Sequence, residues 1–245
     1  MSGHSHWSTI QRKKGANDAK RAQLFTRLSK EIAVSAKEGG DSIEFNPRLR
    51  LAVQKAKDGG MPKDNIARAI KKASTDNTNF EEIWYEGYGP GGAAILVHTL
   101  TDNKNRTSND VRSTFSRQGG NIGELGSVNW LFNRRGMILV SGPLVDLENI
   151  SLESIDLGAL DFNDPSDGSL EIYTELETLE TVREGLNNIG ANVVSSEISM
   201  LPTTTVDLDE NVAGQNIQLL EKLDDLDDVQ HVYTNGIFPE DLETP

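Results

Sequence analysis

The chain has 245 residues, no cysteine and a formal net charge of −14. Without cysteine it can form no disulfide, no thiol nucleophile and no cysteine-ligated zinc site. No run of about 18 apolar residues occurs, and the polar amino end lacks the apolar segment of a signal peptide. We therefore expect a soluble, cytoplasmic protein that does not bind membranes.

Charge is distributed unevenly along the chain. Residues 1–75 carry 16 Lys and Arg against 7 Asp and Glu, whereas residues 136–245 carry 2 against 24. A basic region can neutralise phosphates and release their counterions, while an acidic body repels the same polymer. The asymmetry predicts a nucleic-acid partner that is contacted at one end of the chain. The alternative is a solvated surface with uneven charge.

Residues 17–72 have the pattern of three amphipathic helices. Apolar residues recur every three or four positions, and paired glycines end the first two segments at residues 39–40 and 59–60. Helix start signals stand at Asn17 or Asp18, at Asn46 with Pro47, and at Pro62. We predict a three-helix bundle over residues 21–75, after a basic arm of residues 1–20. The basic side chains of the bundle, Arg27 and Lys55 among them, are expected on its outer surface.

Beyond residues 73–79, which have the composition of a linker, the apolar period becomes typical of strands. Strands are predicted at residues 93–100, 127–132, 137–142, 170–175, 192–200, 204–208 and 228–235. Helices are expected between them, and the first begins at a capping box formed by Thr107 and Asp110. The Gly-rich loop at residues 87–92 precedes a strand and lacks the lysine of a nucleotide loop, so we interpret it as a sharp turn.

The predicted strands divide into two sheet domains. Residues 80–135 and residues 204–240 each hold too few strands for a stable sheet, since three or more are usually required. We predict that these two segments pair into one split domain and that residues 136–203 form an acidic domain inserted between them. The expected fold class is α+β and multidomain: an N-terminal three-helix bundle followed by two ferredoxin-like α+β domains, one inserted in the other.

Candidate catalytic chemistry is sparse. The four histidines, at positions 4, 6, 98 and 231, are scattered, and the many carboxylates are most simply a solvated face. His98 and His231 stand among apolar residues, which indicates strand faces. No nucleophile elbow, zinc-protease motif or nucleotide loop occurs. We expect a protein that is not an enzyme and needs no metal or cofactor; a metabolic enzyme is the alternative.

The amino-terminal segment GHSHWSTIQRKKGANDAKR interleaves rings with basic side chains. Trp7 can stack on an unpaired base, and the Lys and Arg residues that follow can contact phosphates. Folded or single-stranded RNA exposes unstacked bases in a way that duplex DNA does not. Trp7 can equally be a hydrophobic anchor that holds the amino end on the body, and both interpretations stay open.

Several strings, in order along the chain, resemble the YebC/PmpR family. They are GHSHW at residues 3–7, DAKR at 18–21, NPRLRLA at 46–52, MPKDNI at 61–66, YEGYGPGG at 85–92, LTDNKNRT at 100–107 and DDVQ at 227–230. The resemblance implies a cytoplasmic, non-enzymatic regulator of gene expression with a helical amino-terminal domain and two α+β domains. Family members are described as probable transcriptional regulators that bind DNA, and relatives act in translation and contact the ribosome.

Two functional classes stay open: a ribosome-associated translation factor that aids elongation, and a DNA-binding transcriptional regulator. No convincing helix-turn-helix element occurs, and the acidic body would repel long DNA, so the charge layout favours rRNA. The nucleic-acid contacts expected for either class are Gly3, His4, Trp7, Lys13, Lys14, Lys20 and Arg21 in the arm, Arg48, Arg50, Lys63, Lys71 and Lys72 on the bundle, and Asn105 with Arg106 at a helix start. For the last pair a structural turn is the alternative.

Overall fold

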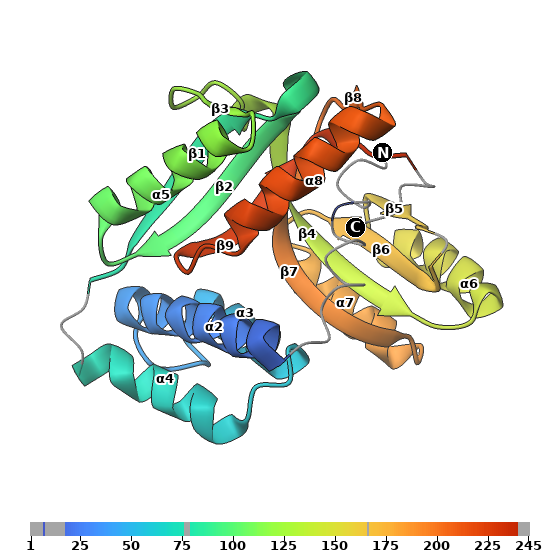
Figure 1. Cartoon of the computed structure of the whole chain (residues 1–245). Helices are drawn as coiled ribbons and strands as arrows, with labels where there is room; N and C mark the ends of the chain where they lie inside the picture. Colours follow the sequence, from blue (N-terminus) through green and yellow to red (C-terminus); the bar gives the residue numbers. More distant parts are fainter. Residues whose placement is uncertain (1–6, 8–17, 76–78, 166, 240–245) are drawn as a thin grey trace.

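The computed structural model describes residue 7 and residues 18–75, 79–165 and 167–239, which form three packed bodies (Figure 1). The first body is the bundle of α2 (Asp18–Gly39), α3 (Pro47–Asp58) and α4 (Lys63–Thr75). Asn46 starts α3, because its side-chain oxygen accepts from the Leu49 amide at 3.0 Å. The side-chain nitrogen of Asn46 donates to the carbonyls of Ser35 and Gly40, each at 2.8 Å. This one buried amide therefore fixes the end of α2 against α3.

The second body, called here the first sheet body, is a four-stranded antiparallel sheet with the order β3-β1-β2-β9. Its elements are β1 (Glu81–Tyr88), β2 (Ala94–Thr101), α5 (Lys104–Arg117), β3 (Asn121–Ile122), α8 (Glu210–Asp224) and β9 (Val229–Thr234). Helices α5 and α8 cover one face of this sheet (Figure 1). Strand β9 pairs with β2, with Val97 opposite Val232, so segments more than 100 residues apart share one sheet.

The third body, called here the second sheet body, lies between these segments in the sequence. It comprises β4 (Phe132–Ser141), α6 (Leu144–Asp156), β5 (Asp161–Asn163), β6 (Ser169–Thr174), α7 (Leu179–Asn188) and β7 (Asn192–Pro202). The strands are antiparallel, in the order β5-β6-β4-β7. A short parallel pair, β8 (Val206–Asp207) with β10 (Gly236–Ile237), forms a separate sheet, and Val206, Leu208 and Phe238 in and beside it pack on the core of the first sheet body.

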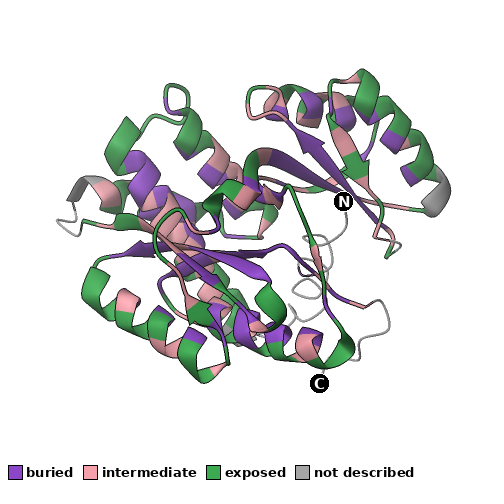
Figure 2. Ribbon diagram, turned by 90° about the horizontal axis from the view of Figure 1, so that it is seen from above, coloured by how far each residue is buried: buried purple, intermediate pink, exposed green. Residues whose placement is uncertain are grey.

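Buried residues follow the strands and the inward sides of the helices, as the purple segments in Figure 2 show. The helix-free face of the first sheet body packs against the start of β4 and the end of β7. There Leu96 and Tyr233 share a core with Phe132 and Met200. The two sheet bodies are thus joined by an apolar contact. Within the described ranges no helix is long and apolar enough to cross a membrane.

The expected fold class is confirmed, since a helical amino-terminal part precedes two α+β bodies and the second lies within the sequence of the first. The residue boundaries assigned to the domains stay a prediction. The turn expected at residues 87–92 contains the 3₁₀ turn η1 (Pro90–Gly92), where Gly91 has φ of 75°. Glycine adopts this left-handed conformation at little energetic cost.

Two local predictions are wrong, and one strand was missed. The strand expected at 127–132 is a turn followed by the 3₁₀ turn η2 (Asn129–Leu131), and β4 begins only at Phe132. Strand β1 was not expected at all. The cap of α5 is Asn103, whose side chain accepts from the Arg106 amide at 3.1 Å, whereas Thr107 of the expected capping box is buried inside the helix. The Thr107 hydroxyl is held by Thr101 and Asp228 instead of capping a helix.

Candidate nucleic-acid interface

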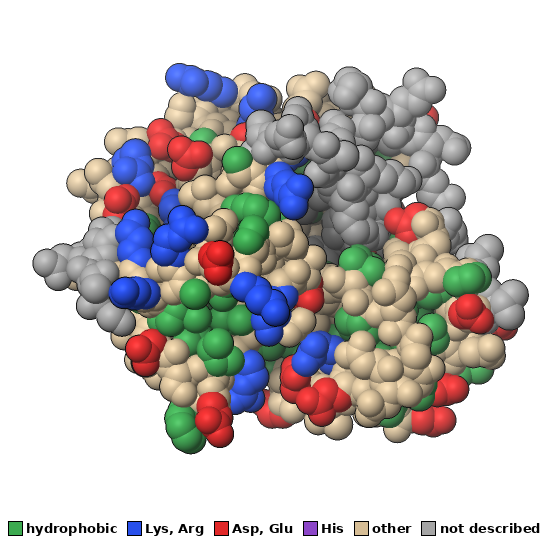
Figure 3. Space-filling model, turned by 90° about the horizontal axis from the view of Figure 1, so that it is seen from below, with side chains coloured by type: hydrophobic (Ala, Val, Ile, Leu, Met, Phe, Trp, Pro, Cys, Tyr) green, Lys and Arg blue, Asp and Glu red, His purple; other side chains and the backbone are tan. Residues whose placement is uncertain are grey.

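A groove of about 780 Å³ lies between α2 and α4. Glu38 is the one carboxylate among its described lining residues, whereas five lining side chains are basic: Lys30, Lys37, Arg68, Lys71 and Lys72. Figure 3 views the bundle from below and shows Lys and Arg side chains around exposed hydrophobic atoms on this face. A cleft lined by charge of one sign raises the local concentration of oppositely charged ligands. The groove is therefore suited to an anionic polymer.

The spacing of residues along the two helices explains the groove. On α2, Ser29, Ala33 and Lys37 repeat every four residues and so lie on one face of the helix. On α4, Arg68 and Lys72 are likewise four residues apart. Alanines 33, 69 and 73 lie along the groove. Their short side chains leave space between two helices whose neighbouring faces form the bundle core.

Two aromatic rings border the groove, and each has a cation beside it. The Arg21 guanidinium carbon lies 5.5 Å from the centroid of the Phe25 ring. The Lys30 ammonium lies 5.9 Å from the centroid of the Phe80 ring. Both distances are within the range of cation–π attraction. Apolar ring faces and fixed positive charge are thus combined in the same groove.

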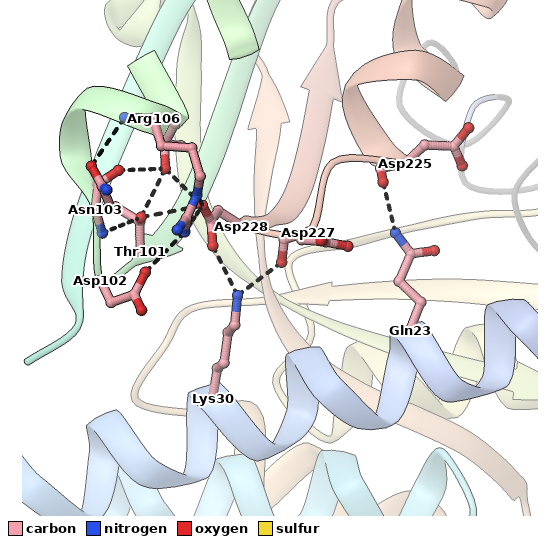
Figure 4. Close-up of polar contacts among 10 residues, drawn as sticks. Gln23, Lys30, Thr101, Asp102, Asn103, Arg106, Asp225, Asp227 and Asp228 are labelled. Carbon is pink, nitrogen blue, oxygen red and sulfur yellow. Dashed lines mark hydrogen bonds and ion pairs between the residues drawn. The ribbon is translucent and has the colours of Figure 1, made fainter. Parts of the chain in front are cut away.

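An adjoining face of α2 docks on the acidic turn between α8 and β9 (Figure 4), and Lys30 belongs to both this face and the groove. The side-chain amide of Gln23 donates to the Asp225 carbonyl at 3.2 Å. Arg27 Nη1 lies 2.9 Å from the Asp224 carboxylate. Gln23, Arg27 and Lys30 are four and three residues apart, so one stripe of α2 is committed to this contact. The contact fixes the orientation of α2, which forms one wall of the groove.

Asp228 is the centre of this junction. Its Oδ2 lies 2.6 Å from Arg106 Nη2 and accepts from the Thr107 hydroxyl at 2.8 Å, while its Oδ1 lies 3.0 Å from Lys30 Nζ (Figure 4). Arg106 Nη2 also lies 2.9 Å from Asp102. Burial alone would raise the pKa of Asp228, but hydrogen bonds from Arg106, Lys30 and Thr107 outweigh it and lower the pKa below its usual value. The carboxylate therefore stays charged and joins α2, α5 and β9.

Two family descriptions match nearly the whole chain. The TACO1/YebC protein N-terminal domain matches residues 5–76, and the TACO1/YebC second and third domain matches residues 80–236. The chain belongs to the TACO1/YebC family. A protein of Dehalococcoides mccartyi is 52% identical over 99% of this chain and 98% of its own length. A protein of Geobacter sulfurreducens is 49% identical over 99% of both chains, and each of these relatives is named a probable transcriptional regulatory protein.

A solved structure shows the same fold. The crystal structure of a conserved hypothetical protein from Aquifex aeolicus is 42% identical, with a TM-score of 0.85 over 93% of this chain and 95% of the other. The resemblance to the YebC/PmpR family is thereby confirmed. In this TACO1/YebC protein the strings LTDNKNRT and DDVQ, far apart in the sequence, meet at the Asp228 junction.

The expected contacts on α4 lie at the groove or near it. Lys71 and Lys72 line the groove, and Lys63 is exposed at the first position of α4. Lys20 and Arg21 are exposed in the first turn of α2. Gly3, His4, Lys13 and Lys14 lie outside the described residues. The structure therefore brings Lys71 and Lys72 together with basic residues of α2 on one face of the TACO1/YebC bundle.

Other expected contacts have structural partners. Arg48 forms ion pairs with Glu38 of α2 and, at 2.9 Å, with Glu82 of β1. Arg50 donates to the carbonyls of Ile43 and Glu44 and so closes the loop before α3. Arg106 is held by two carboxylates, and Asn105 lies in the first turn of α5. For Asn105 and Arg106 this geometry favours the structural alternative over a phosphate site.

The expected exposure of Arg27 and Lys55 is wrong. Only 15% of the Arg27 side chain and 18% of the Lys55 side chain are exposed. Both lie where the TACO1/YebC bundle meets a sheet body, and both are paired with carboxylates from other elements. Amphipathic periodicity identifies the face of each helix that is turned away from the bundle core. Another body of the same protein can still cover that face.

Of the two interpretations of Trp7, the structure favours the anchor. The side chain is 1% exposed and packs in the core of the first sheet body with Phe115, Leu219 and Phe238. A ring enclosed in this way offers no face to a base. Trp7 therefore anchors the amino end on the first sheet body.

Sequence reasoning did not select Lys30, Lys37 and Arg68 as contacts, nor the rings of Phe25 and Phe80. The signal available for the basic residues was their position on the helix: Lys30 and Lys37 are seven residues apart on α2, and Arg68 precedes Lys72 by one turn. Nothing in the sequence indicated that these two stripes face each other across a groove.

Proposed function

We propose that this TACO1/YebC protein is a non-enzymatic, nucleic-acid-binding regulator of gene expression. In this proposal it acts in the cytoplasm as a ribosome-associated translation factor that aids elongation. The basic bundle contacts rRNA, and the arm residues Gly3, His4, Lys13 and Lys14 extend that contact. The single observation that carries the proposal is the groove between α2 and α4, where five basic side chains accompany one carboxylate.

The use of charge elsewhere in the protein supports the same proposal. Arg27, Arg48 and Lys55 lie outside the groove lining and pair with carboxylates within the protein. Of the five basic side chains of the groove, Lys30 is also paired, with Asp228. The groove lining, with five basic side chains and one carboxylate, contrasts with residues 136–245, which carry 2 Lys and Arg against 24 Asp and Glu. Such a body would repel long DNA but can face basic ribosomal proteins. A ribosome offers RNA and basic protein surfaces side by side, which matches both ends of this chain.

The second candidate function is DNA-binding transcriptional regulation. It is favoured by the names of the relatives, which are called probable transcriptional regulatory proteins. On this proposal the groove face would lie against DNA phosphates, and specificity would need side chains that reach base edges.

Sedimentation with purified ribosomes distinguishes these candidates. The full chain is centrifuged through sucrose gradients with ribosomes at increasing salt, alongside gel-shift assays with promoter DNA. We expect co-sedimentation at low salt, progressive release as salt rises, and weaker association of the double variant Lys13→Glu, Lys14→Glu. Failure to co-sediment at any salt, together with binding to discrete promoter fragments, would replace the proposal by the transcriptional one.

A further inference from the structure

We infer that the groove between α2 and α4 receives an unpaired nucleotide, with its base against the aromatic lining and its phosphates at the basic rim. This inference rests on the proposed function and specifies how the bundle would hold RNA. The groove differs from a plain basic surface because aromatic and other apolar side chains line it together with the cations.

The size and lining of the groove fit a flat, partly apolar ligand. Its volume of about 780 Å³ lies within the range of small-molecule sites. Phe25, Ala33, Val34 and Phe80 contribute apolar surface, and both rings are half-buried, so each is held in place while remaining accessible. Proteins that bind single strands stack bases on such rings without requiring a particular sequence.

The charges of the groove come from both walls. Lys37 stands on α2, and Arg68, Lys71 and Lys72 stand on α4. The carboxylate that accompanies them, Glu38, is already paired with Arg48. A nucleotide whose base enters between the helices would therefore have its phosphates beside cations on either side. Charge-assisted contacts of this kind are the strong hydrogen bonds of phosphate recognition.

The combination of an aromatic lining and a basic rim disfavours a duplex. In a double helix the bases are stacked and paired, so only phosphates and groove edges reach a protein surface. The apolar part of the groove would then stay empty, and only the basic rim would contribute. An unpaired nucleotide satisfies both parts, which predicts a preference for single strands or loops.

The experiment measures fluorescence anisotropy of the full chain with a labelled single-stranded RNA, the same sequence as a duplex, and a single-stranded DNA. The variant Phe80→Leu removes the ring but keeps apolar bulk. The matched control is Phe45→Leu, because Phe45 is 81% exposed and lies in the loop between α2 and α3, away from the groove lining. We expect Phe80→Leu to weaken single-strand binding about tenfold with an unchanged salt slope, and Phe45→Leu to bind as the wild type does.

The outcomes separate this inference from the proposed function. If the wild type binds RNA but Phe80→Leu binds equally well, or if the duplex is preferred, the inference is wrong while the proposed function stands. If the wild type binds no nucleic acid, both fail. Equal binding of single-stranded DNA would also support the inference, because unpaired bases and phosphates are common to both strands. If Phe80→Leu does not fold, photocrosslinking of 4-thiouridine RNA to the wild type decides: crosslinks in α2, α4 or residues 79–80 support the inference, and crosslinks only elsewhere overturn it.

Discussion

The ammonium nitrogen of Lys55 lies 3.0 Å from Oε2 of Glu197 and joins α3 of the bundle to β7 of the second sheet body. It also lies 3.5 Å from Glu31 and 2.8 Å from the His231 ring on β9. Burial by itself lowers the pKa of Lys55, but the two carboxylates outweigh burial and raise the pKa above its usual value. One cation therefore pairs with two carboxylates at the point where the three bodies meet.

Replacing this cation should weaken the junction of the three bodies and lower the stability of the protein. In Lys55→Met, Glu31 and Glu197 face each other without a positive charge, so we expect a loss of about 3 kcal/mol of stability. Urea unfolding followed by circular dichroism measures the change. The control is Lys57→Met, since Lys57 is exposed on the same helix. Equal midpoints for the two variants would show that the Lys55 cluster does not hold the bodies together.

The Asp228 junction gives a second prediction. Asp228→Asn removes the charge that Arg106 and Lys30 share; it leaves Lys30 partly buried without that counter-charge and leaves Arg106 with Asp102 alone. We expect destabilisation by about 2 kcal/mol and faster amide exchange at the amino-terminal end of α5. Asp227→Asn is the matched control, because the Asp227 side chain is exposed and only its carbonyl contacts Lys30. Wild-type amide exchange in Asp228→Asn would contradict this role of the Asp228 junction.

Acid should weaken the contact between the bundle and β1. The hydrogen bond with His98 is the largest influence on Glu82 and, with Arg48, lowers its pKa to about 2 from 4.5, while burial opposes the shift. The unfolded chain therefore takes up this proton at higher pH than the folded chain does. Stability from Glu82 is complete above about pH 4.5 and is lost as the pH falls towards 2.

Thermal unfolding midpoints measured between these two pH values test this assignment. We expect Glu82→Gln to flatten the acid dependence, because the group no longer titrates. Glu81→Gln, which changes an exposed neighbour on the same strand, should keep the wild-type slope. Identical slopes in both variants would place the acid sensitivity elsewhere.

A buried carboxylate shapes the loop before β4. Glu86 is 3% exposed and accepts from the backbone amides of Gly126 and Val128 at 2.7 Å and of Asn129 at 2.8 Å. In Glu86→Gln, an amide group must face these donors, so we expect a loss of about 2 kcal/mol and faster hydrogen exchange at the three amides. Glu124→Gln is the control on the exposed part of the loop. Unchanged exchange in Glu86→Gln would contradict this role.

The salt dependence of RNA binding tests the basic groove. Lys71→Glu with Lys72→Glu should weaken binding and reduce the salt slope by about one unit for each phosphate that the variant no longer neutralises. The control is Lys222→Glu, because Lys222 is a mostly exposed cation on α8, outside the groove lining. An unchanged slope in the double variant would remove Lys71 and Lys72 from the interface.

The fold could be predicted from the sequence where regularly spaced apolar residues place one face of a helix or strand in the core. The bundle and most strands of the second sheet body follow this rule. Strand β1 was missed because charged residues surround its apolar centre, Ile83 to Tyr85. One of them, Glu86, is buried because its carboxylate binds backbone amides 40 to 43 residues away. No local pattern encodes a contact of that range.

The candidate site could likewise be predicted only in part. Lys71 and Lys72 were identifiable as exposed cations on a helix, and the groove does contain them. The sequence could not separate them from Arg48 and Arg106, whose partners Glu82 and Asp228 lie 34 and 122 residues away. Which cations line the groove is decided by the packing of the three bodies, and the pairing of α2 with α4 across a groove is a tertiary property as well.

The most direct test of the central claim is ultraviolet crosslinking in cells, with recovery of the protein under denaturing conditions and sequencing of the attached RNA and DNA. We expect reads concentrated on one region of rRNA. They should be strongly reduced in the Lys71→Glu, Lys72→Glu variant and retained in Lys222→Glu. Discrete promoter DNA without rRNA enrichment would contradict the account and establish a transcriptional regulator instead.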